Sequence, residues 1–183
     1  MTPERCAAEL ERIATTSPMV KFLLEQMEKS GCKIKVDDGR FFKVERCEEE
    51  VLGSFVPGKG IKMCHNQIST RTDMENMLAH ELIHAYDDCT RKNMNWLNVE
   101  HHACSEVRAA NLSGDCHWVN EFFRGRVKLK GQHKNCARRR AELSVAMSPK
   151  CTESENPEEC AREAVDKVFE RCFEDTMPFD DIP

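Results

Sequence analysis

Eleven cysteines in a chain of 183 residues restrict the fold more than any other feature of this sequence. A reducing compartment would leave most of them as idle thiols, whereas an oxidising compartment joins them into disulfides. The spacing Cys-x-x-Cys does not occur, which removes the usual support for a zinc finger or a thioredoxin-like site. Because eleven is odd, at least one thiol stays free or pairs between chains. The cysteines therefore predict a disulfide-stapled protein.

The length suits one compact domain with a single hydrophobic core. The net charge of −5 argues against direct nucleic-acid binding, because nucleic-acid binders neutralise phosphates with surplus Lys and Arg. Residues 124–140, the basic segment, depart from this balance and contain no acidic residue. The basic segment is either a solvated helix face or a surface for an anionic lipid or partner. Its basic residues are Arg124, Arg126, Lys128, Lys130, Lys134, Arg138, Arg139 and Arg140.

No run approaches the roughly 18 apolar residues that a membrane-spanning helix needs. The N-terminal stretch MTPERCAAELERIATTSPM lacks the apolar core of a signal peptide, and its glutamates do not suit a basic transit peptide. We therefore expect neither a cleaved leader nor a membrane span. The mitochondrial intermembrane space is one compartment that reconciles this N-terminus with so many cysteines.

Local patterns predict helices followed by strands and then by further helices. Ser17 and Pro18 separate two short helices between Pro3 and Lys29. Asp-Gly within residues 32–47 predicts a first hairpin, and Pro-Gly-Lys-Gly at 57–60 predicts a turn between strands at 52–56 and 60–68. A small antiparallel sheet combined with helices belongs to the α+β class.

The helices that follow have recognisable ends. Thr72 and Glu75 match a capping box, which predicts that a helix begins there and continues through MENMLAHELIHAYDDC. Further helices are predicted at 97–112, 132–147 and 157–173. The predicted single domain has N-terminal helices at 1–31, the sheet and motif-bearing helices at 32–118, and a cysteine-containing helical hairpin at 119–183.

The sequence HELIH at residues 80–84 carries the strongest chemical signal. On a helix, His80 and His84 fall on one face a turn apart, so each can offer a ring nitrogen to one Zn²⁺ ion. Glu81 leans across the same site, where it can take a proton from an attacking water and return it to a leaving amine. The pattern predicts a zinc metallopeptidase centre. The strand near Lys62 to Gln67 would be the sheet edge along which an extended substrate adds.

A catalytic zinc site usually has three protein ligands and one open position, so a third ligand must be found. We predict Glu106, which begins the pattern Glu-x-x-small on the following helix and resembles the third ligand of the glutamate branch of zinc proteases. Asp87 and Asp88 are alternatives because they return to the zinc face of their helix. His101 or His102 could also reach the metal. The residues that do not ligate it would orient a ligand or stabilise the oxyanion.

The segments HELIHAYDDC and NWLNVEHHACSEVRAANLSGDC resemble the mitochondrial inner-membrane metalloprotease family of ATP synthase assembly, also described as Ku-binding-protein-like. The resemblance runs from about Cys32 to the C-terminus, and the family's motif residues correspond to His80, Glu81 and His84. It implies a zincin-like metalloprotease that lies in the intermembrane space, peripherally attached to the inner membrane, and that folds oxidatively.

The resemblance also implies two separable activities. One is removal of an N-terminal propeptide from the membrane-embedded proton-channel subunit of ATP synthase. The other is assistance in the assembly of that subunit, together with assembly factors, without proteolysis. Three hypotheses follow: a zinc endopeptidase, a protease-independent assembly chaperone with a secondary zinc site, and, more weakly, a structural zinc site in a DNA-repair-associated module.

The last four cysteines permit a geometric prediction. If residues 132–147 and 157–173 form a helical hairpin that turns near Ser154, two cysteine pairs are nearly symmetric about the turn. We therefore predict an inner bridge between Cys151 and Cys160 and an outer bridge between Cys136 and Cys172.

Overall fold

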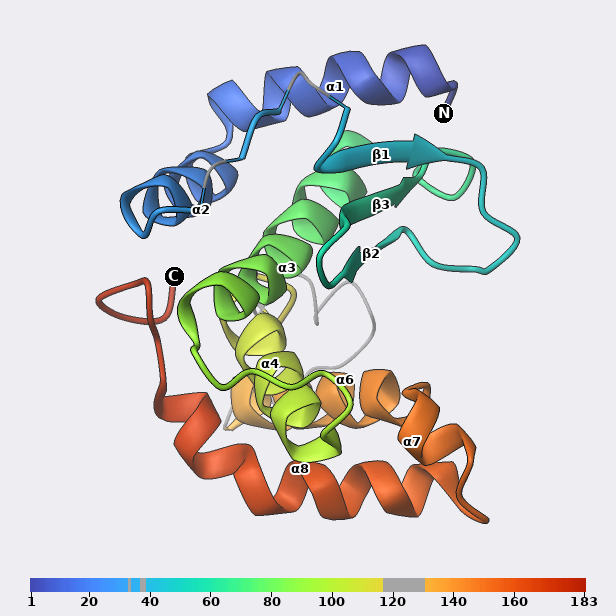
Figure 1. Cartoon of the computed structure of the whole chain (residues 1–183), viewed down its shortest axis with the longest axis vertical. Coiled ribbons are helices and arrows are strands. Elements are labelled where there is room, and N and C mark those ends of the chain that lie inside the picture. Colours follow the sequence, from blue (N-terminus) through green and yellow to red (C-terminus); the bar gives the residue numbers. More distant parts are fainter. Residues whose placement is uncertain (33, 37–38, 117–130) are drawn as a thin grey trace. The chain divides into compact units, whose positions relative to one another are not determined.

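The computed structural model describes residues 1–32, 34–36, 39–116 and 131–183. The chain divides into two compact units, Met1–Lys92 and Asn93–Pro183, and each is described by itself. The first unit combines helices with a small sheet, and the second is helical in its described part, so the α+β class is confirmed (Figure 1). Within the described residues, no helix combines the length and the apolar character needed to cross a membrane.

Helices α1 (Pro3–Thr16) and α2 (Pro18–Lys29) open the first unit, and their separation at Ser17 confirms the prediction. The Ser17 hydroxyl accepts a hydrogen bond from the Val20 N–H at 3.4 Å and so caps α2. Both helices are amphipathic. Their buried apolar residues include Leu10 and Leu23.

The sheet contains β1 (Phe42–Glu45), β2 (Gly53–Val56) and β3 (Gly60–Cys64) in the order β1-β3-β2. Strands β2 and β3 form the predicted antiparallel hairpin. Strand β1 pairs in parallel with β3, so the sheet is mixed. Residues 34–36, which would belong to the first strand of the hairpin predicted within residues 32–47, form no strand, and residues 37 and 38 at its turn lie outside the described residues. The Asp-Gly signal is local, whereas the pairing of β1 with β3 joins segments far apart in sequence.

The strand order also corrects the predicted substrate edge. Strand β3, which contains Lys62, pairs on both sides and is the central strand, so the prediction of an edge at Lys62 to Gln67 is wrong. Ile61 and Met63 are fully buried, as expected for a strand with neighbours on both sides. In the described sheet, β2 is the outer strand on the side away from β1.

Gly60 explains why the hairpin can lie so close to the start of β1. It has φ +97°, and a Cβ atom there would come within 2.1 Å of the Phe41 carbonyl oxygen. The same carbonyl accepts a 2.7 Å hydrogen bond from the Ile61 N–H. Only glycine fits this approach, so the turn composition that predicted the hairpin also permits the β1–β3 pairing.

Helix α3 (Arg71–Thr90) packs against α2 and β2 and carries the HELIH sequence. It begins with N-cap Thr70 and a capping box to Asp73, two residues before the predicted Thr72. The overlapping Thr-x-x-Asp and Thr-x-x-Glu patterns both satisfy the capping rule, which is why the sequence favoured the wrong one. Two disulfides, Cys32–Cys89 and Cys47–Cys64, cross-link this unit.

The second unit contains α4 (Val99–Leu112), α6 (Gln132–Ala146), α7 (Pro149–Thr152) and α8 (Pro157–Glu174). Helices α4, α6 and α8 pack against one another in pairs. Small residues such as Ala103, Ala141 and Ala164 line the core and let the helix axes approach, while Phe169 fills the centre.

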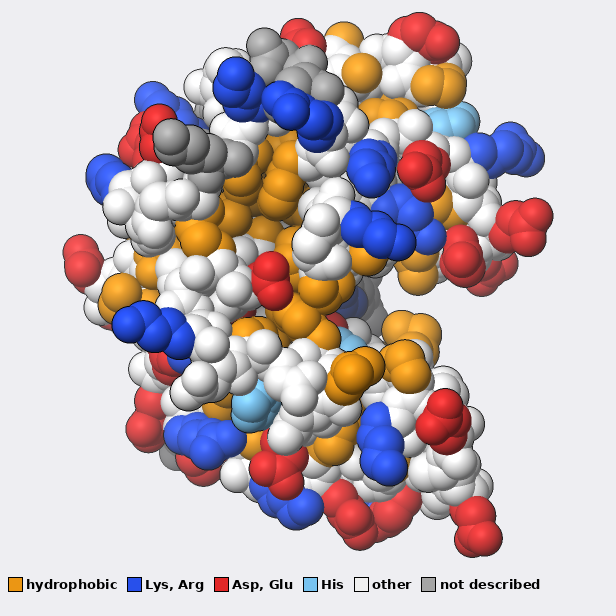
Figure 2. All heavy atoms as spheres, in the orientation of Figure 1, with side chains coloured by type: hydrophobic (Ala, Val, Ile, Leu, Met, Phe, Trp, Pro, Cys, Tyr) orange, Lys and Arg blue, Asp and Glu red, His pale blue; other side chains and the backbone are white. Residues whose placement is uncertain are grey.

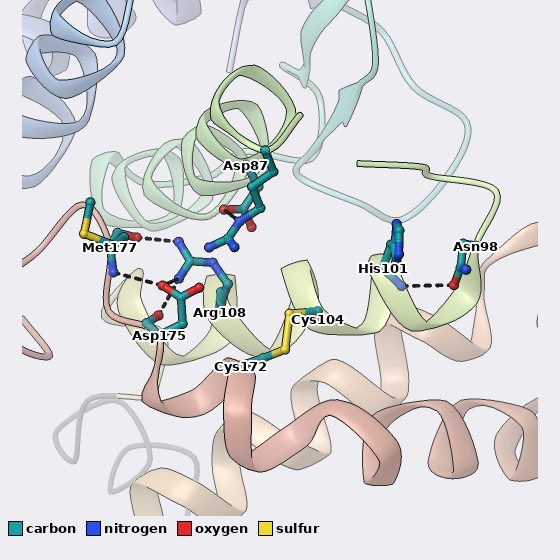
Figure 3. The surroundings of a disulfide bond; sticks show 9 residues. Asp87, Asn98, His101, Cys104, Arg108, Cys172, Asp175 and Met177 are labelled. Atoms are coloured by element: carbon teal, nitrogen blue, oxygen red, sulfur yellow. Dashed lines mark hydrogen bonds and ion pairs between the residues drawn. A yellow bond between two sulfur atoms is a disulfide. The ribbon is translucent and has the colours of Figure 1, made fainter. Parts of the chain in front are cut away.

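The disulfides confirm one predicted bridge and correct the other. Cys151 pairs with Cys160 as predicted. Cys172 pairs with Cys104 (Figure 3), and Cys136 pairs with Cys116, so the predicted Cys136–Cys172 bridge is wrong. The prediction treated α6 and α8 as an isolated hairpin, but α4 packs against both helices. Cys104 on α4 and Cys116 just after it are the partner cysteines. With five disulfides formed, Cys6 is the free cysteine, and burial raises the pKa of its thiol.

The basic segment is described only from residue 131 onward, and its earlier part lies outside the described residues. In the described part, Lys134 pairs with Glu170 at 2.6 Å and Arg138 pairs with Asp166, both on α8. Arg140 contacts Asp115 at 2.7 Å. Figure 2 shows acidic and basic side chains interspersed along the α8 side of this unit. These basic residues therefore face carboxylates of their own chain.

Candidate metal centre

Helix α3 presents His80 and His84 one turn apart, as the spacing predicts. Their ring centroids are 4.8 Å apart and their planes are nearly perpendicular, at 79°. His84 and Glu81 are buried and His80 is half-buried. Two imidazoles at this separation can direct nitrogens toward one ion.

Glu81 is held by the sheet. Its Oε2 atom accepts a 2.6 Å hydrogen bond from the backbone N–H of Phe55 on β2. The Cys64 N–H donates to the Leu52 carbonyl, so Leu52 and Cys64 are a hydrogen-bonded pair. Hydrogen-bonded pairs alternate along an antiparallel ladder, and in this register Phe55 and Ile61 are a pair without hydrogen bonds between them. The Phe55 N–H therefore points away from β3, toward the outer edge of the sheet, where Glu81 receives it.

Glu106 lies on α4 and is buried, with 5% of its surface exposed. Its Oε1 atom is 3.2 Å from Nε2 of His102, one turn earlier on the same helix. The Nδ1 atom of His101 accepts from the Asn95 N–H at 3.2 Å. The two histidines that the sequence left as alternative ligands thus make local contacts within their own unit.

His80, His84 and Glu106 form one group that could hold a metal ion. A candidate ligand atom from each lies within 4.8 Å of the other two. A tetrahedral ion with ligands roughly 2 Å away needs ligand atoms about 3.3 Å apart, which is within this limit. Two imidazole nitrogens and a carboxylate oxygen are a donor set that zinc accepts. The residues present therefore fit a zinc ion.

The two aspartates have other roles in the described contacts. Asp87 is 1% exposed, and its Oδ1 atom accepts from Arg91 Nε at 3.0 Å. Asp88 lines a surface cavity of the first unit. Neither belongs to the group of candidate ligands formed by the described residues.

Two interactions near these residues were not anticipated from the sequence. One is the hydrogen bond from the Phe55 N–H to Glu81, because every residue type except proline has a backbone N–H and the sequence does not mark this one. The other is Arg108, which is fully buried two residues after Glu106. Its guanidinium donates to the carbonyl oxygens of Asp175 and Met177 and lies 2.5 Å from the Asp175 carboxylate (Figure 3). The sequence signal that could have indicated this buried arginine is its position among small apolar residues on α4.

Comparison with known proteins identifies the family of this chain. The Peptidase M76 family model matches residues 4–180. The chain is 44% identical over 182 residues to the Mitochondrial inner membrane protease ATP23 homolog of Homo sapiens, covering 98% of this chain and 71% of the relative. It is 39% identical to Mitochondrial inner membrane protease ATP23 of Yarrowia lipolytica, covering 97% of this chain and 68% of that protein.

A third relative is Mitochondrial inner membrane protease atp23 of Schizosaccharomyces pombe, 36% identical over 180 residues, with 98% of this chain and 93% of the relative covered. No solved structure matches the chain. The match spans nearly the whole sequence and includes the HELIH helix and Glu106. The chain therefore belongs to the Peptidase M76 family, a family of metallopeptidases.

Proposed function

We propose that this protein is a zinc-dependent endopeptidase in which His80, His84 and Glu106 hold the metal. The observation that supports this most directly is the close group of candidate ligand atoms from these three residues. Glu81, adjacent to His80 on the same helix, supplies a carboxylate for proton transfer. When bound there, zinc would activate a water molecule and polarise the scissile carbonyl.

Glu81 acts as the general base and then as the general acid. Its carboxylate accepts the proton of the attacking water and passes it to the nitrogen of the leaving amine. The hydrogen bond from Phe55 restrains Oε2, which leaves Oε1 for the transferred proton. Because that donor is a backbone group of a paired strand, the carboxylate is positioned before substrate arrives.

The substrate backbone is proposed to add along β2 rather than along β3. Strand β2 is an outer strand of the described sheet, and an outer strand offers an extended peptide its outward backbone groups, here those other than the Phe55 N–H that Glu81 accepts. The Glu81 contact with Phe55 places the general base at this strand. We infer that the chain works as one zincin-like metalloprotease domain, since residues from both halves of the sequence are needed for the site.

We further propose that the protein acts in the intermembrane space, peripherally attached to the inner membrane, on a membrane-embedded ATP synthase subunit. The relatives' names support the inner membrane and a protease activity. Five disulfides support an oxidising compartment. Its partners would be this substrate and other assembly factors, with no direct contact to nucleic acid.

Glu81→Gln tests the peptidase role. The variant should bind one zinc per chain, as the parent does, and should lose cleavage of a peptide spanning the subunit's N-terminus by at least about a hundredfold, because a general base contributes roughly that much. A variant that binds zinc and cleaves as well as the parent would refute the assignment.

Expressed in cells that lack the protein, Glu81→Gln also tests the assembly alternative. Restored ATP synthase assembly without cleavage would support a separate chaperone activity.

A further inference from the structure

A cavity of about 520 Å³ opens in the first unit. Phe55, whose N–H holds Glu81, is one of its lining residues. Ala85 and Asp88 continue the same face of α3, four and seven residues after Glu81, and line the cavity as well. The cavity therefore shares Phe55 with the contact of the proposed general base, and its lining includes the C-terminal end of α3.

The interior of this cavity is apolar. Met27, Ile34, Phe41 and Phe55 line it together with the Ala85 methyl group. Figure 2 shows apolar side chains in a hollow of the first unit, between the places where α2 and the sheet lie in Figure 1. A space of this size accepts a large aliphatic or aromatic side chain, and burying one there contributes roughly 1.5–3 kcal/mol.

The margin of the cavity is predominantly cationic. Lys35, Arg40 and Lys59 are exposed at the lining, whereas Asp88 is the one carboxylate among the described lining residues. Figure 2 shows Lys and Arg side chains beside the hollow. A carboxylate on a bound peptide would be attracted by three charges of opposite sign and repelled by one.

The walls are covalently and sterically restrained. The Cys32–Cys89 disulfide joins the segment before Ile34 to the end of α3, and both cysteines line the cavity. The β2–β3 turn forms another part of the lining, and Gly60 allows its close approach to Phe41. A pocket with fixed walls can discriminate among side chains, since ordering it on binding costs little.

We propose that this cavity is a substrate side-chain subsite of the peptidase, which takes a large apolar residue of the substrate with an acidic residue next to it. The inference rests on the proposed endopeptidase function and extends it to a class of peptide sequence. The apolar floor supplies affinity, and the rim of Lys35, Arg40 and Lys59 selects the acidic neighbour. Its position beside Phe55 and Glu81 puts the preferred residues close to the scissile bond.

A binding experiment tests the subsite without requiring turnover. The probes are three fluorescein-labelled hexapeptides with Ala at the outer positions and Glu-Leu, Gln-Leu or Glu-Ala at the centre. Fluorescence anisotropy measures their binding to the full oxidised chain carrying Glu81→Gln. The Glu-Leu peptide should bind at least about fivefold more tightly than either of the others, a difference of the size expected for rim charges or a partly buried side chain.

Charge reversal at the rim is the discriminating change. In the same background, Lys35→Glu with Lys59→Glu should abolish or invert the preference for Glu-Leu over Gln-Leu, and Phe41→Ala should weaken the preference for Leu over Ala. The matched control is Lys21→Glu, which reverses a lysine on α2 that lies outside the cavity and pairs with Glu25. Circular dichroism and a count of free thiols verify that each variant is folded and fully bridged.

The outcomes separate the subsite from the peptidase activity. Absence of binding up to millimolar peptide, absence of the Glu-Leu preference, or an unchanged preference after charge reversal would each overturn the subsite. Cleavage of the same peptides by the zinc-loaded parent chain is measured in parallel. A Glu-Leu preference in binding with no zinc-dependent cleavage would support the subsite and refute the proposed function. Zinc-dependent cleavage without a Glu-Leu preference in binding would support the proposed function and refute the subsite.

Discussion

The Glu81 carboxylate on α3 accepts a 2.6 Å hydrogen bond from the Phe55 backbone N–H on β2. This contact links the HELIH helix to the outer strand through an N–H that the sheet itself does not use. The same strand thus has two roles in the proposal. It restrains the general base and also offers an edge to the substrate.

Replacing Phe55 with proline removes that N–H while leaving the hydrogen bonds between β2 and β3 intact. We expect kcat to fall about tenfold with a smaller change in KM, because the base loses its restraint and the outer strand tolerates proline. Ser54→Pro is the control. Ser54 is directly paired with Lys62, so proline there should lower the melting temperature instead. An unchanged kcat for a folded Phe55→Pro variant would contradict the positioning role.

Zinc content distinguishes the proposed ligands from their alternatives. His80→Ala, His84→Ala and Glu106→Ala should each lower zinc to well below one ion per chain, measured by mass spectrometry after dialysis against a weak chelator. Asp88→Asn and His101→Ala should retain zinc. Loss of the metal in either of these two, with retention in Glu106→Ala, would assign the third ligand elsewhere.

His102 contacts Glu106 and should act through it. Removing a group that orients a metal ligand typically weakens metal affinity by roughly 10- to 100-fold. His102→Ala should therefore bind zinc more weakly by about that factor in a competition titration with a fluorescent chelator. The neighbouring His101→Ala variant provides the comparison, and equal affinities for the two variants would show that His102 has no such role.

Arg108 holds the C-terminal segment through two carbonyl oxygens and the Asp175 carboxylate. Arg108→Met should destabilise the protein by about 3 kcal/mol, since it removes a fully buried charged donor and leaves its partly buried partners without that donor. Arg162 pairs with Glu159 on the exposed face of α8, so Arg162→Met should cost less than about 1 kcal/mol. Denaturant unfolding measures both. Similar losses in the two variants would contradict the importance of burial at Arg108.

The disulfides should differ in their contribution to stability. Cys104–Cys172 closes a separation of 68 residues, whereas Cys151–Cys160 closes a separation of 9. By loop entropy, the paired serine variant of the first bridge should be about 2 kcal/mol less stable than that of the second. Chemical unfolding under non-reducing conditions gives this comparison, and the opposite order would show that native contacts rather than chain entropy dominate.

Thiol titration should detect Cys6 alone. The native protein should react slowly with a thiol reagent near neutral pH, because the side chain is buried and burial raises the pKa of the thiol. Denaturation without reductant should expose one thiol per chain, and full reduction should expose eleven. More than one thiol before reduction would mean that a disulfide is absent.

Several local features follow from the residues themselves. The Ser17-Pro18 break, the β2–β3 turn and the one-turn spacing of His80 and His84 are each determined by neighbours within a few positions. The Cys151–Cys160 bridge belongs to the same group, because its partners lie on either side of one short connection. Glu106 was a reasonable expectation from its pattern, and its role as ligand stays a prediction that zinc analysis can test.

Other features depended on which segments pack together. The parallel β1–β3 pairing, the central position of β3 and the partners of Cys136 and Cys172 all join residues that are distant along the chain. Periodicity and caps specify the face and the ends of an element but leave its neighbours undetermined. The sequence by itself thus determined the motif helix, the local turns and the cysteine-rich character. Tertiary packing decided the edge strand, the outer disulfides and the backbone donor to Glu81, because burial of apolar surface selects among pairings that local rules allow equally.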